Sequence, residues 1–561
     1  MNNRILIFIL LFTLVFISCT EDFTEINENP IEFTSDQVSA KFFVTNVQTN
    51  LFAPNRYPYW RGPLIHADRF AGQHTFGFSA CWWNDGLAYQ YNSGYTDAVY
   101  DWIAGYNSAL TAYLNFVKEG GQLENDKYYA IGLIMKGLYY QFYTDTFGMV
   151  PYSEASDPDI VTPKYDSQKD IYKGIIADLD KAITLIGSEA TTGTGVDLLK
   201  ENDLFFQGDL QAWKMLANSL KLRIGLRAHG APEDDFSATA VSSAISGGIL
   251  GDKNAVIPRD TNINQWISAT YGDIWHNFYG GGHWNLGVDM VDLLRNNNDP
   301  RIQKQAKPSV GGTIKMKKPT EGDNVALFDK HIKYITDLLD NSKATYTKTV
   351  DGSTGDVTIV MDPGAYVGFP TRANGKIKPY LHTELFSKPA DIVVNKKNTG
   401  QPIFPYLVMT AAESHLMVAE AIVKGLASGN AQTHYQQGLR HAMTLWEVDS
   451  ADIDSFIANE PMALLNGTMD QNLEKIASQR WLANYTNGFE AWAIVRDSGY
   501  PSRLYAGVSD SDIHELGDLN GAYPQRMRYG SSVYSTNSAN VTAANKVQGA
   551  DVQATKLWWA K

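Results

Sequence analysis

Two stretches of the chain concentrate aromatic residues among Asn, Asp, His and Gly, and these side chains are the best suited to holding a ligand. The first stretch runs from Cys81 to Tyr91 and the second from Trp275 to Asn285. An aromatic ring offers a rigid apolar face at low entropy cost, while neighbouring amides, carboxylates and imidazoles bind hydroxyl groups. Recognition of sugar-like ligands needs this combination. The competing interpretation is that the rings only pack in the core or within their own loops.

No catalytic signature accompanies these aromatic residues. The chain lacks the His-Glu-x-x-His zinc motif, the Gly-x-x-x-x-Gly-Lys phosphate loop and the Gly-x-Ser-x-Gly nucleophile turn. The glycines 280–282 follow aromatic residues instead of a strand, so they do not indicate a dinucleotide site. His276 and His283 are seven residues apart in this Gly-rich loop, and two such histidines do not define a zinc site. We therefore predict no catalytic residues and no metal ligands.

A secreted α-helical glycoside hydrolase is the enzymatic alternative. Glycoside hydrolysis needs two carboxylates about 5–9.5 Å apart in a cleft. Asp85 and Asp273 are the candidates, although neither lies in a recognisable catalytic motif. The sequence leaves this alternative open.

Composition excludes several other classes of protein. The 561 residues are 44% hydrophobic and 12% aromatic, enough for a large core and too apolar for a disordered chain. The net charge of −14 repels phosphate backbones, and no run of Lys and Arg is longer than two residues. We expect neither a nucleic-acid partner nor a polybasic contact with lipid headgroups.

The first 18 residues have the anatomy of a secretory signal. Arg4 precedes an apolar stretch, residues 5–17, that is shorter than the roughly 20 residues of a membrane span. It ends in Ser18-Cys19, which resembles a bacterial lipoprotein signal with Phe16 in place of the usual Leu. This resemblance implies removal of residues 1–18 and acylation of Cys19, and several acyl chains on one cysteine give stable anchoring. An ordinary cleaved signal with a chance cysteine is the alternative.

The residues after Cys19 predict the final membrane. Position 20 is Thr and not Asp, which argues against retention in the inner membrane. Glu21 and Asp22 resemble the surface-export signal of Bacteroidetes lipoproteins. We expect a protein lipid-anchored in the outer membrane and facing the cell exterior. The chain has only one other cysteine, Cys81, so acylation of Cys19 leaves no pair for a disulfide.

Apolar residues recur at the helical spacing i, i+3, i+4 and i+7 in many parts of the chain. The segments with this pattern or with other helical character are 97–118, 131–142, 169–187, 213–224, 416–426, 430–447 and 470–485. They predict helix pairs of about tetratricopeptide size, stacked into a scaffold with a concave binding surface.

Other stretches lack this period. Residues 345–361 alternate and contain Asp351-Gly352, a pattern that predicts a β-hairpin. Residues 52–95 and 262–290 are rich in Gly, Asn, Trp and Tyr and show no clear period. We predict that both are long loops, which are usually functional in compact proteins.

Six motifs, in order behind the lipoprotein signal, resemble those of the SusD/RagB family, the surface glycan-binding lipoproteins of Bacteroidetes. They are residues 26–30; residues 142–155, with a Gly-x-x-Pro-Tyr-x-Glu-Ala turn; Trp213 with 217–223 and Arg227; 412–414 with 419–421; 488–492 with Arg496 and 499–501; and 523–529, followed by Gly530 where Pro is usual. The resemblance implies a mainly α SusD-like fold with tetratricopeptide-like helix pairs, a loop-rich irregular part and a minor β-hairpin. It implies one domain over residues 19–561.

The family motifs themselves are predicted to be structural. Arg223, Arg227, Glu413 and Glu420 lie on helices that also carry apolar stripes, so we expect buried ion pairs, because an unpaired buried charge is too costly. Residues 148–151, Gly-Met-Val-Pro, are expected to end a helix and turn the chain.

The resemblance implies a function in binding and not in catalysis. The protein would hold a glycan or another nutrient and pass it to a SusC-like TonB-dependent transporter. By position in the family, the ligand-binding residues would be Trp82, Trp83, Asn84, Asp85, Tyr89, Trp275, His276, Asn277, Tyr279 and Trp284. We predict no cofactor: the loop Asp and Asn residues are compatible with Ca²⁺, but no EF-hand-type spacing occurs. A surface protein that only gates its transporter is a further alternative.

Overall fold

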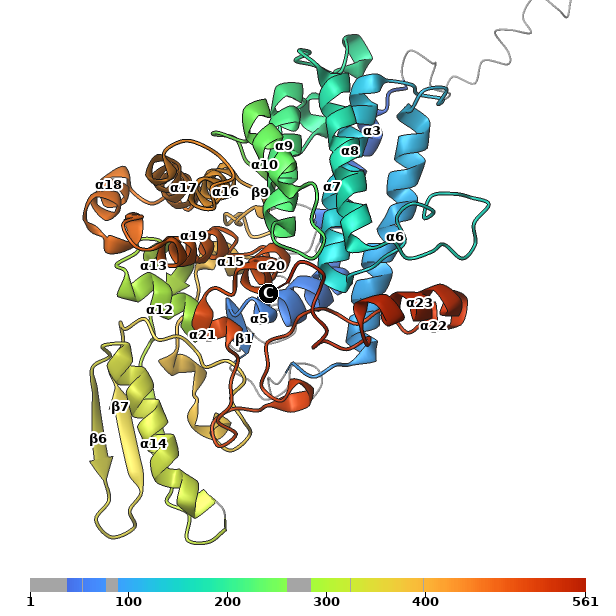
Figure 1. Ribbon diagram of the computed structural model, residues 1–561. Helices are drawn as coiled ribbons and strands as arrows, with labels where there is room; N and C mark the ends of the chain where they lie inside the picture. The colour runs from blue at the N-terminus through green and yellow to red at the C-terminus, as the bar shows by residue number, and fades with distance from the viewer. Residues whose placement is uncertain are drawn as a thin grey trace, which may run out of the picture.

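The computed structural model describes residues 38–52, 54–76, 89–259, 284–322, 324–396 and 398–560, and helices make up most of this part (Figure 1). The helices of nine or more residues are α3 (Lys41–Phe52), α6 (Ser93–Val117), α7 (Asp126–Phe147), α8 (Gln168–Ile186), α9 (Leu210–Ala228), α10 (Ser237–Gly247), α12 (Val288–Asn296), α14 (Asn324–Asn341), α16 (Ala411–Val423), α17 (Ala431–Leu445), α18 (Ser450–Asn459), α19 (Met469–Ala483), α20 (Gly488–Ser498) and α23 (Ser538–Gln548).

Short helical segments and strands connect these helices. The short segments are α4 (Arg56–Tyr59), η1 (Trp60–Ala67), α5 (Asp68–Phe70), η2 (Gly195–Asp197), η3 (Lys200–Asn202), α13 (Ile302–Gln305), η4 (Lys378–Tyr380), η5 (Thr383–Leu385), α15 (Asp391–Val394), η6 (Pro461–Ala463), α21 (Ser502–Tyr505), η7 (Gly517–Leu519) and α22 (Val533–Thr536). The strands are β1 (His74–Phe76), β2 (Ala255–Ile257), β3 (Trp284–Leu286), β4 (Ala306–Lys307), β5 (Gly312–Met316), β6 (Tyr346–Val350), β7 (Val357–Met361), β8 (Lys388–Pro389) and β9 (Tyr406–Met409).

Consecutive helices pack against each other as pairs, notably α7 with α8, α9 with α10, and α16 with α17. Figure 1 shows α7 to α10 grouped at the top of the molecule and α16 to α19 at its left. The apolar residues that predicted these helices are the ones that pack: Ile131, Ile134 and Leu138 of α7 are all buried. The predicted mainly helical fold is therefore confirmed. In the described part of the chain, no helix combines the length and apolarity of a membrane span.

The ends of α7 show how local sequence sets a helix boundary. The side chain of Asn125 accepts hydrogen bonds from the backbone N–H groups of Lys127 and Tyr128, which caps the first turn. At the other end Gly148 adopts a φ of 89°, a conformation that favours glycine, and Pro151 follows. The predicted stop at residues 148–151 is confirmed.

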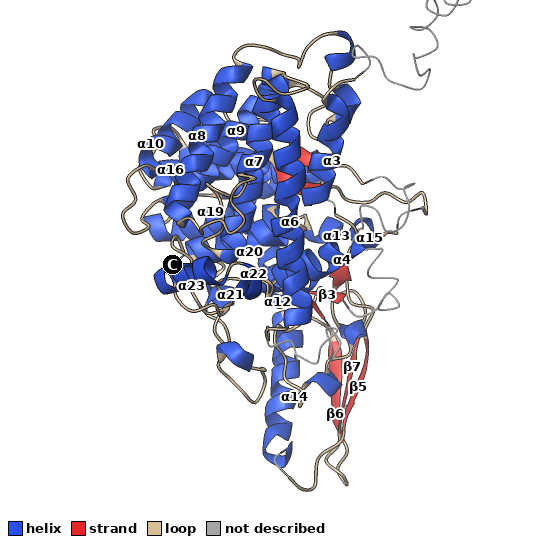
Figure 2. Cartoon of the chain, turned by 90° about the vertical axis from the view of Figure 1, so that its right-hand side faces the viewer, coloured by secondary structure: helices blue, strands red, loops and turns tan. Residues whose placement is uncertain are grey.

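Two of the small sheets bear on the predictions from the sequence. β5, β7 and β6 form a three-stranded antiparallel sheet that lies beside α14, away from the main helices (Figure 2). It contains the hairpin predicted over residues 345–361. β1 pairs with β3 in an antiparallel sheet, with His74 opposite Leu286 and Phe76 opposite Trp284. β3 lies at the end of the second aromatic stretch, and β1 ends five residues before the first one begins.

The prediction of a long loop over residues 52–95 is wrong in part. Residues 56–70 are helical through α4, η1 and α5, and α6 already begins at Ser93. Seven of the eight residues of η1 are buried, so this helix has no polar face and therefore no apolar stripe to detect. The second predicted loop, 262–290, likewise includes β3 and the start of α12.

Gly438 of α17 allows the close approach of α16, which predicts a stability effect. A Cβ atom at Gly438 would lie 2.6 Å from Cγ of Leu416 and 3.0 Å from the carbonyl oxygen of Ala412. We expect Gly438→Ala to lower the free energy of unfolding by about 1–3 kcal/mol, because the helices must separate. Gly105→Ala in α6 is the matched control: a Cβ there meets no atom within 4 Å, so it should stabilise by about 0.5–1 kcal/mol. Urea unfolding measures the change in the free energy of unfolding in both variants. Equal changes would refute the packing argument.

Candidate functional site

Most of the predicted site residues lie outside the described residues. These are Cys19, Trp82, Trp83, Asn84, Asp85, Trp275, His276, Asn277 and Tyr279, together with Asp273 of the enzymatic alternative. Tyr89 and Trp284 are described, and both are buried, with 4% and 2% of their surface exposed.

Trp284 lies in β3, which pairs with β1. Its ring is 6.4 Å from that of His74 in β1, and His74 in turn hydrogen-bonds the hydroxyl of Tyr485 at 2.9 Å. Because Trp284 is enclosed by this packing, its replacement would disturb the β1–β3 sheet as well as any contact with a ligand. Its predicted role in binding stays a prediction.

Tyr89 forms part of a packed group of cations and rings. Its hydroxyl donates to the carbonyl oxygen of Arg69 at 3.0 Å, and its ring lies 5.3 Å from the guanidinium of Arg69 and 4.8 Å from that of Arg372. Arg372 donates to the carbonyl oxygens of Leu516, Gly521 and Ala522, which holds this C-terminal segment in place. Burial lowers the pKa of Arg372.

A cavity of about 370 Å³ opens beside Tyr89. Its walls come from α12, α14, residues 370–372 and residues 503–523. The aromatic residues in the wall are Tyr89, Tyr334 and Tyr523, and the polar ones are Asp289, Thr371, Arg372, Arg503, Ser509, Asp510 and His514. The side-chain hydroxyls of Thr371 and Ser509 make no hydrogen bond within the described residues, so both are free to bind a ligand. Size and lining suit a small polar molecule with apolar faces, such as a sugar.

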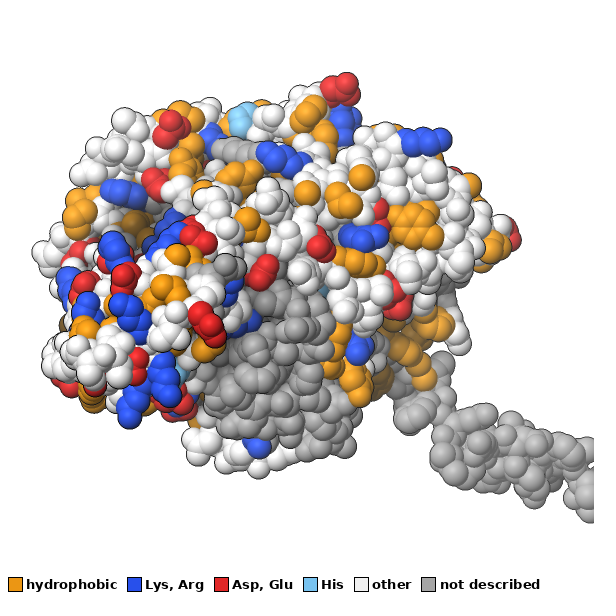
Figure 3. Space-filling view, turned by 90° about the horizontal axis from the view of Figure 1, so that it is seen from below, with side chains coloured by type: hydrophobic (Ala, Val, Ile, Leu, Met, Phe, Trp, Pro, Cys, Tyr) orange, Lys and Arg blue, Asp and Glu red, His pale blue; other side chains and the backbone are white. Residues whose placement is uncertain are grey.

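Ion pairs hold the walls of this cavity. Arg503 donates from Nε to Asp289 at 2.5 Å and from Nη1 to Asp292 at 2.9 Å, which ties α21 to α12. Lys330 of α14 contacts Asp510 at 2.8 Å and Asp512 at 2.6 Å. Burial raises the pKa of Asp289, although Arg503 opposes the shift. Seen from below, cationic and anionic side chains are interspersed over the lobe formed by α14 and β5–β7 (Figure 3).

A second group of aromatic residues lies at the start of η1. The guanidinium of Arg61 stands 5.4 Å from the ring of Tyr57, 5.1 Å from that of Trp60 and 5.4 Å from that of Tyr95. Tyr57 is 49% exposed, so this group offers a ring and a cation at the surface. In the sequence, the run Tyr57-Pro58-Tyr59-Trp60-Arg61 carries the same combination of rings and charge, within the predicted loop 52–95.

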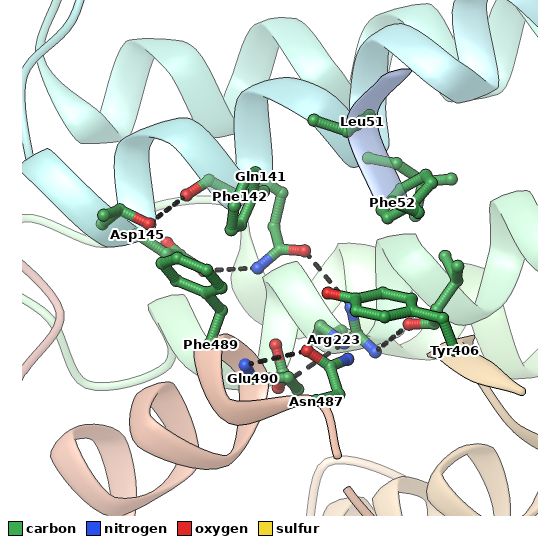
Figure 4. Close-up of a pocket in the computed structure, with 13 residues that line it drawn as sticks. Leu51, Phe52, Gln141, Phe142, Asp145, Arg223, Tyr406, Asn487, Phe489 and Glu490 are labelled. Carbon is green, nitrogen blue, oxygen red and sulfur yellow. Dashed lines mark hydrogen bonds and ion pairs between the residues drawn. The ribbon is translucent and has the colours of Figure 1, made fainter. Parts of the chain in front are cut away.

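The centre of the molecule contains a network of buried charges around a cavity of only about 40 Å³ (Figure 4). Arg223 contacts Glu413 at 2.6 Å, Arg480 contacts Glu420 at 2.6 Å, and Arg227 bridges Asp145 and Glu490. The predicted burial and pairing of Arg223, Arg227, Glu413 and Glu420 is confirmed.

This network is structural and does not resemble a catalytic pair. Burial alone would raise the pKa of Glu490, but Arg223, Arg227 and Arg480 hold it below its ordinary value. Glu490 is therefore ionised and engaged by arginine, and it has no proton to donate to a leaving group. The cavity has room for about one or two water molecules. Among the described residues, no three His, Cys, Asp or Glu side chains are arranged to hold one metal ion.

Asp497 at the edge of this network predicts a pH effect. Burial raises its pKa to about 6, with Lys424 opposing and Glu420 adding to the shift. A carboxyl group whose pKa is raised on folding stabilises below its unfolded pKa of about 4, and this stability is lost as the pH rises through 6. The stability of Asp497→Asn relative to the native protein should therefore increase by about 1 kcal/mol between pH 5 and pH 7. Denaturant unfolding at the two pH values tests this, and a constant difference would contradict it.

Comparison with known proteins shows which family and which fold this chain resembles. The chain matches the SusD-like family described as "Starch-binding associating with outer membrane" over residues 32–530. No curated protein sequence matches. A solved structure named a chitin-binding protein is 21% identical, with a TM-score of 0.70, covering 93% of this chain and 100% of its own. A SusD homologue from Bacteroides uniformis is 21% identical, with a TM-score of 0.69, covering 93% of this chain and 99% of its own.

A SusD-like protein from Bacteroides thetaiotaomicron is also 21% identical, with a TM-score of 0.67, covering 93% of this chain and 98% of its own. At these identities the likeness to solved structures concerns the fold. The sequence match extends over most of the 561 residues. The chain belongs to the SusD-like family.

Proposed function

We propose that this protein binds a glycan or another nutrient at the cell surface and delivers it to a SusC-like TonB-dependent transporter, without catalysing a reaction. The observation that carries the proposal is the family match, whose description combines starch binding with the outer membrane. The relative named a chitin-binding protein supports a carbohydrate ligand. The glycan itself is left open, because the loops and not the scaffold determine what is bound.

The ligand would bind to residues of the two predicted aromatic stretches and to the cavity beside Tyr89. Trp82, Trp83, Asn84 and Asp85 precede Tyr89, which lines the cavity of about 370 Å³. Trp275, His276, Asn277 and Tyr279 precede β3, which pairs with β1. The cavity would take one sugar unit among its hydroxyls and tyrosine rings, while the tryptophans would stack further units of the chain.

Anchoring would follow from the N-terminal signal. Residues 1–18 would be removed and Cys19 acylated, so that the folded chain stands outside the outer membrane beside its transporter. Membrane fractionation of producing cells tests this part: the native protein should sediment with outer membranes and co-purify with a transporter barrel. Cys19→Ala should release the chain from the membrane fraction. Equal sedimentation of both forms would refute the lipid anchor.

The binding part of the proposal is tested with the purified protein and a panel of oligosaccharides that includes starch and chitin fragments. Binding with no release of reducing ends supports it. Released reducing ends would instead favour the glycoside hydrolase, and co-purification with a transporter in the absence of any ligand would favour a purely gating role.

A further inference from the structure

Three histidine side chains meet between helices α16 and α17, away from the candidate ligand cavity. His415 belongs to α16, and His434 and His441 lie two turns apart on α17. The ring of His415 lies between the other two, with ring centroids 5.3 Å from His434 and 5.4 Å from His441. The rings of His415 and His441 are parallel to within 1°. No family motif noted in the sequence includes His415, His434 or His441.

The hydrogen bonds of His415 fix which of its nitrogens carries the proton. Its Nε2 lies 2.9 Å from the carbonyl oxygen of Gly251, and a carbonyl oxygen can only accept. Nε2 is therefore the donor, and in the neutral imidazole Nδ1 presents a lone pair. That lone pair faces Nδ1 of His434 at 3.1 Å, so His434 donates to it.

The separation of these two nitrogens is that of a hydrogen bond, and it also allows both of them to bind one metal ion. Imidazole nitrogens bind Zn²⁺ at about 2.0–2.1 Å, so two of them at tetrahedral positions are about 3.3 Å apart. The observed separation of 3.1 Å is close to that value. In addition, a metal-binding histidine usually donates its other ring N–H to a carbonyl or carboxylate, as His415 does to Gly251.

The electrostatic state of the three rings is compatible with metal binding. Burial lowers the pKa of His415 to about 4, with the Gly251 carbonyl opposing and the other two histidines adding to the shift. Burial also lowers the pKa of His434 and of His441. All three rings are therefore neutral near pH 7, and neutral imidazole is the form that binds metal ions.

We propose that Nδ1 of His415 and Nδ1 of His434 bind one divalent transition-metal ion, such as Zn²⁺, Ni²⁺ or Cu²⁺. On binding, the proton on Nδ1 of His434 moves through solvent to Nε2 of the same ring, so both ligands stay neutral and the ion takes the place of that proton. Water completes the coordination shell, since no third His, Cys, Asp or Glu of the described residues joins the pair as a ligand. The site would therefore be exchangeable, unlike a four-ligand structural zinc site.

The test is calorimetric titration of the metal-stripped, untagged protein with ZnCl₂ and with NiCl₂. We expect one ion per chain and at least a tenfold loss of affinity in His434→Gln, which alters a partly exposed side chain. His382→Gln, at an exposed histidine elsewhere, is the matched control and should bind as the native protein does. Cu²⁺ electron paramagnetic resonance should show two nitrogen ligands in the native protein.

Two results would overturn the proposal: the absence of metal binding by the native protein, or affinity in His434→Gln equal to that of the native protein. Circular dichroism of each variant separates loss of the site from loss of the fold. Glycan binding is measured on the same samples without metal. The metal site and the proposed function are therefore tested independently.

Discussion

Arg227→Met is expected to lower the free energy of unfolding by about 3–5 kcal/mol, the largest effect of any substitution considered for the scaffold. Arg227 is 1% exposed and contacts the carboxylates of both Asp145 and Glu490. Methionine fills much of the same volume but leaves these two carboxylates buried together without their shared cation. The cost is that of two charges in a medium of low polarity, and it exceeds the loss of two hydrogen bonds.

The loss of stability should be large because the other groups that contact Asp145 and Glu490 are already engaged and do not replace Arg227. Asp145 is already bound by the hydroxyl of Tyr172 at 2.5 Å, and Glu490 is 3.6 Å from Arg223 and 3.9 Å from Arg480. Both of these arginines have their own carboxylate partners.

Arg440→Met is the matched control for the measurement. Arg440 contacts Asp454 at 2.7 Å, but the two side chains are 46% and 63% exposed, so water solvates both charges. We expect a change within about 1 kcal/mol. Guanidinium unfolding of the two variants under the same conditions gives the comparison. A loss in Arg227→Met no greater than that in Arg440→Met would show that the network does not stabilise the fold.

The double variant Trp82→Ala/Trp83→Ala is expected to weaken glycan binding by about 100-fold, or roughly 3 kcal/mol, because stacked aromatic anchors dominate such interfaces. Phe42→Ala is the control: Phe42 is 56% exposed on α3 and belongs to neither aromatic stretch. Isothermal titration with the tightest-binding oligosaccharide measures both. An unchanged affinity in the double variant would remove the first stretch from the site.

Two further variants locate the ligand among the described residues. Ser509→Trp adds bulk at the exposed edge of the 370 Å³ cavity and should abolish binding there without disturbing the core. Tyr57→Ala removes the exposed ring beside Arg61. Loss of binding in the first variant alone would place the ligand in the cavity, and loss in the second alone would place it at the start of η1.

The sequence predicted the parts of the fold whose signals are local. The amphipathic helix α8 and the hairpin of β6 and β7 lie within a residue or two of the predicted bounds. The buried ion pairs were also predictable in kind, because Arg223 and Glu413 lie on helices with apolar stripes. Their partners across the chain were not, since Arg227 meets Asp145 and Glu490 only through the tertiary fold.

The helix η1 and the third strand of the sheet escaped prediction for different physical reasons. η1 is buried on nearly all sides, so burial erased the period by which a helix is recognised. β5 pairs with β7 although it comes about 40 residues earlier in the chain. In the sequence, α14 separates the two strands. The five residues of β5, Gly312–Met316, do not indicate by themselves that β7 is their partner strand.

The candidate site stays a prediction for most of its residues, because all of them except Tyr89 and Trp284 lie outside the described residues. Trp284 of the second aromatic stretch pairs with Phe76, five residues before the first stretch begins. The cavity wall could not be anticipated, because Thr371, Arg503 and Ser509 lie in segments with no motif, and only the fold brings them to Tyr89.

The central claim is that this protein holds a carbohydrate and leaves it intact. The most direct measurement is titration calorimetry of the purified native protein against starch, chitin and other oligosaccharides, followed by chromatography of each ligand after prolonged incubation. We predict saturable binding of at least one oligosaccharide and recovery of that ligand unchanged. Conversion of the ligand into shorter products, or no binding to any member of the panel, would contradict the claim.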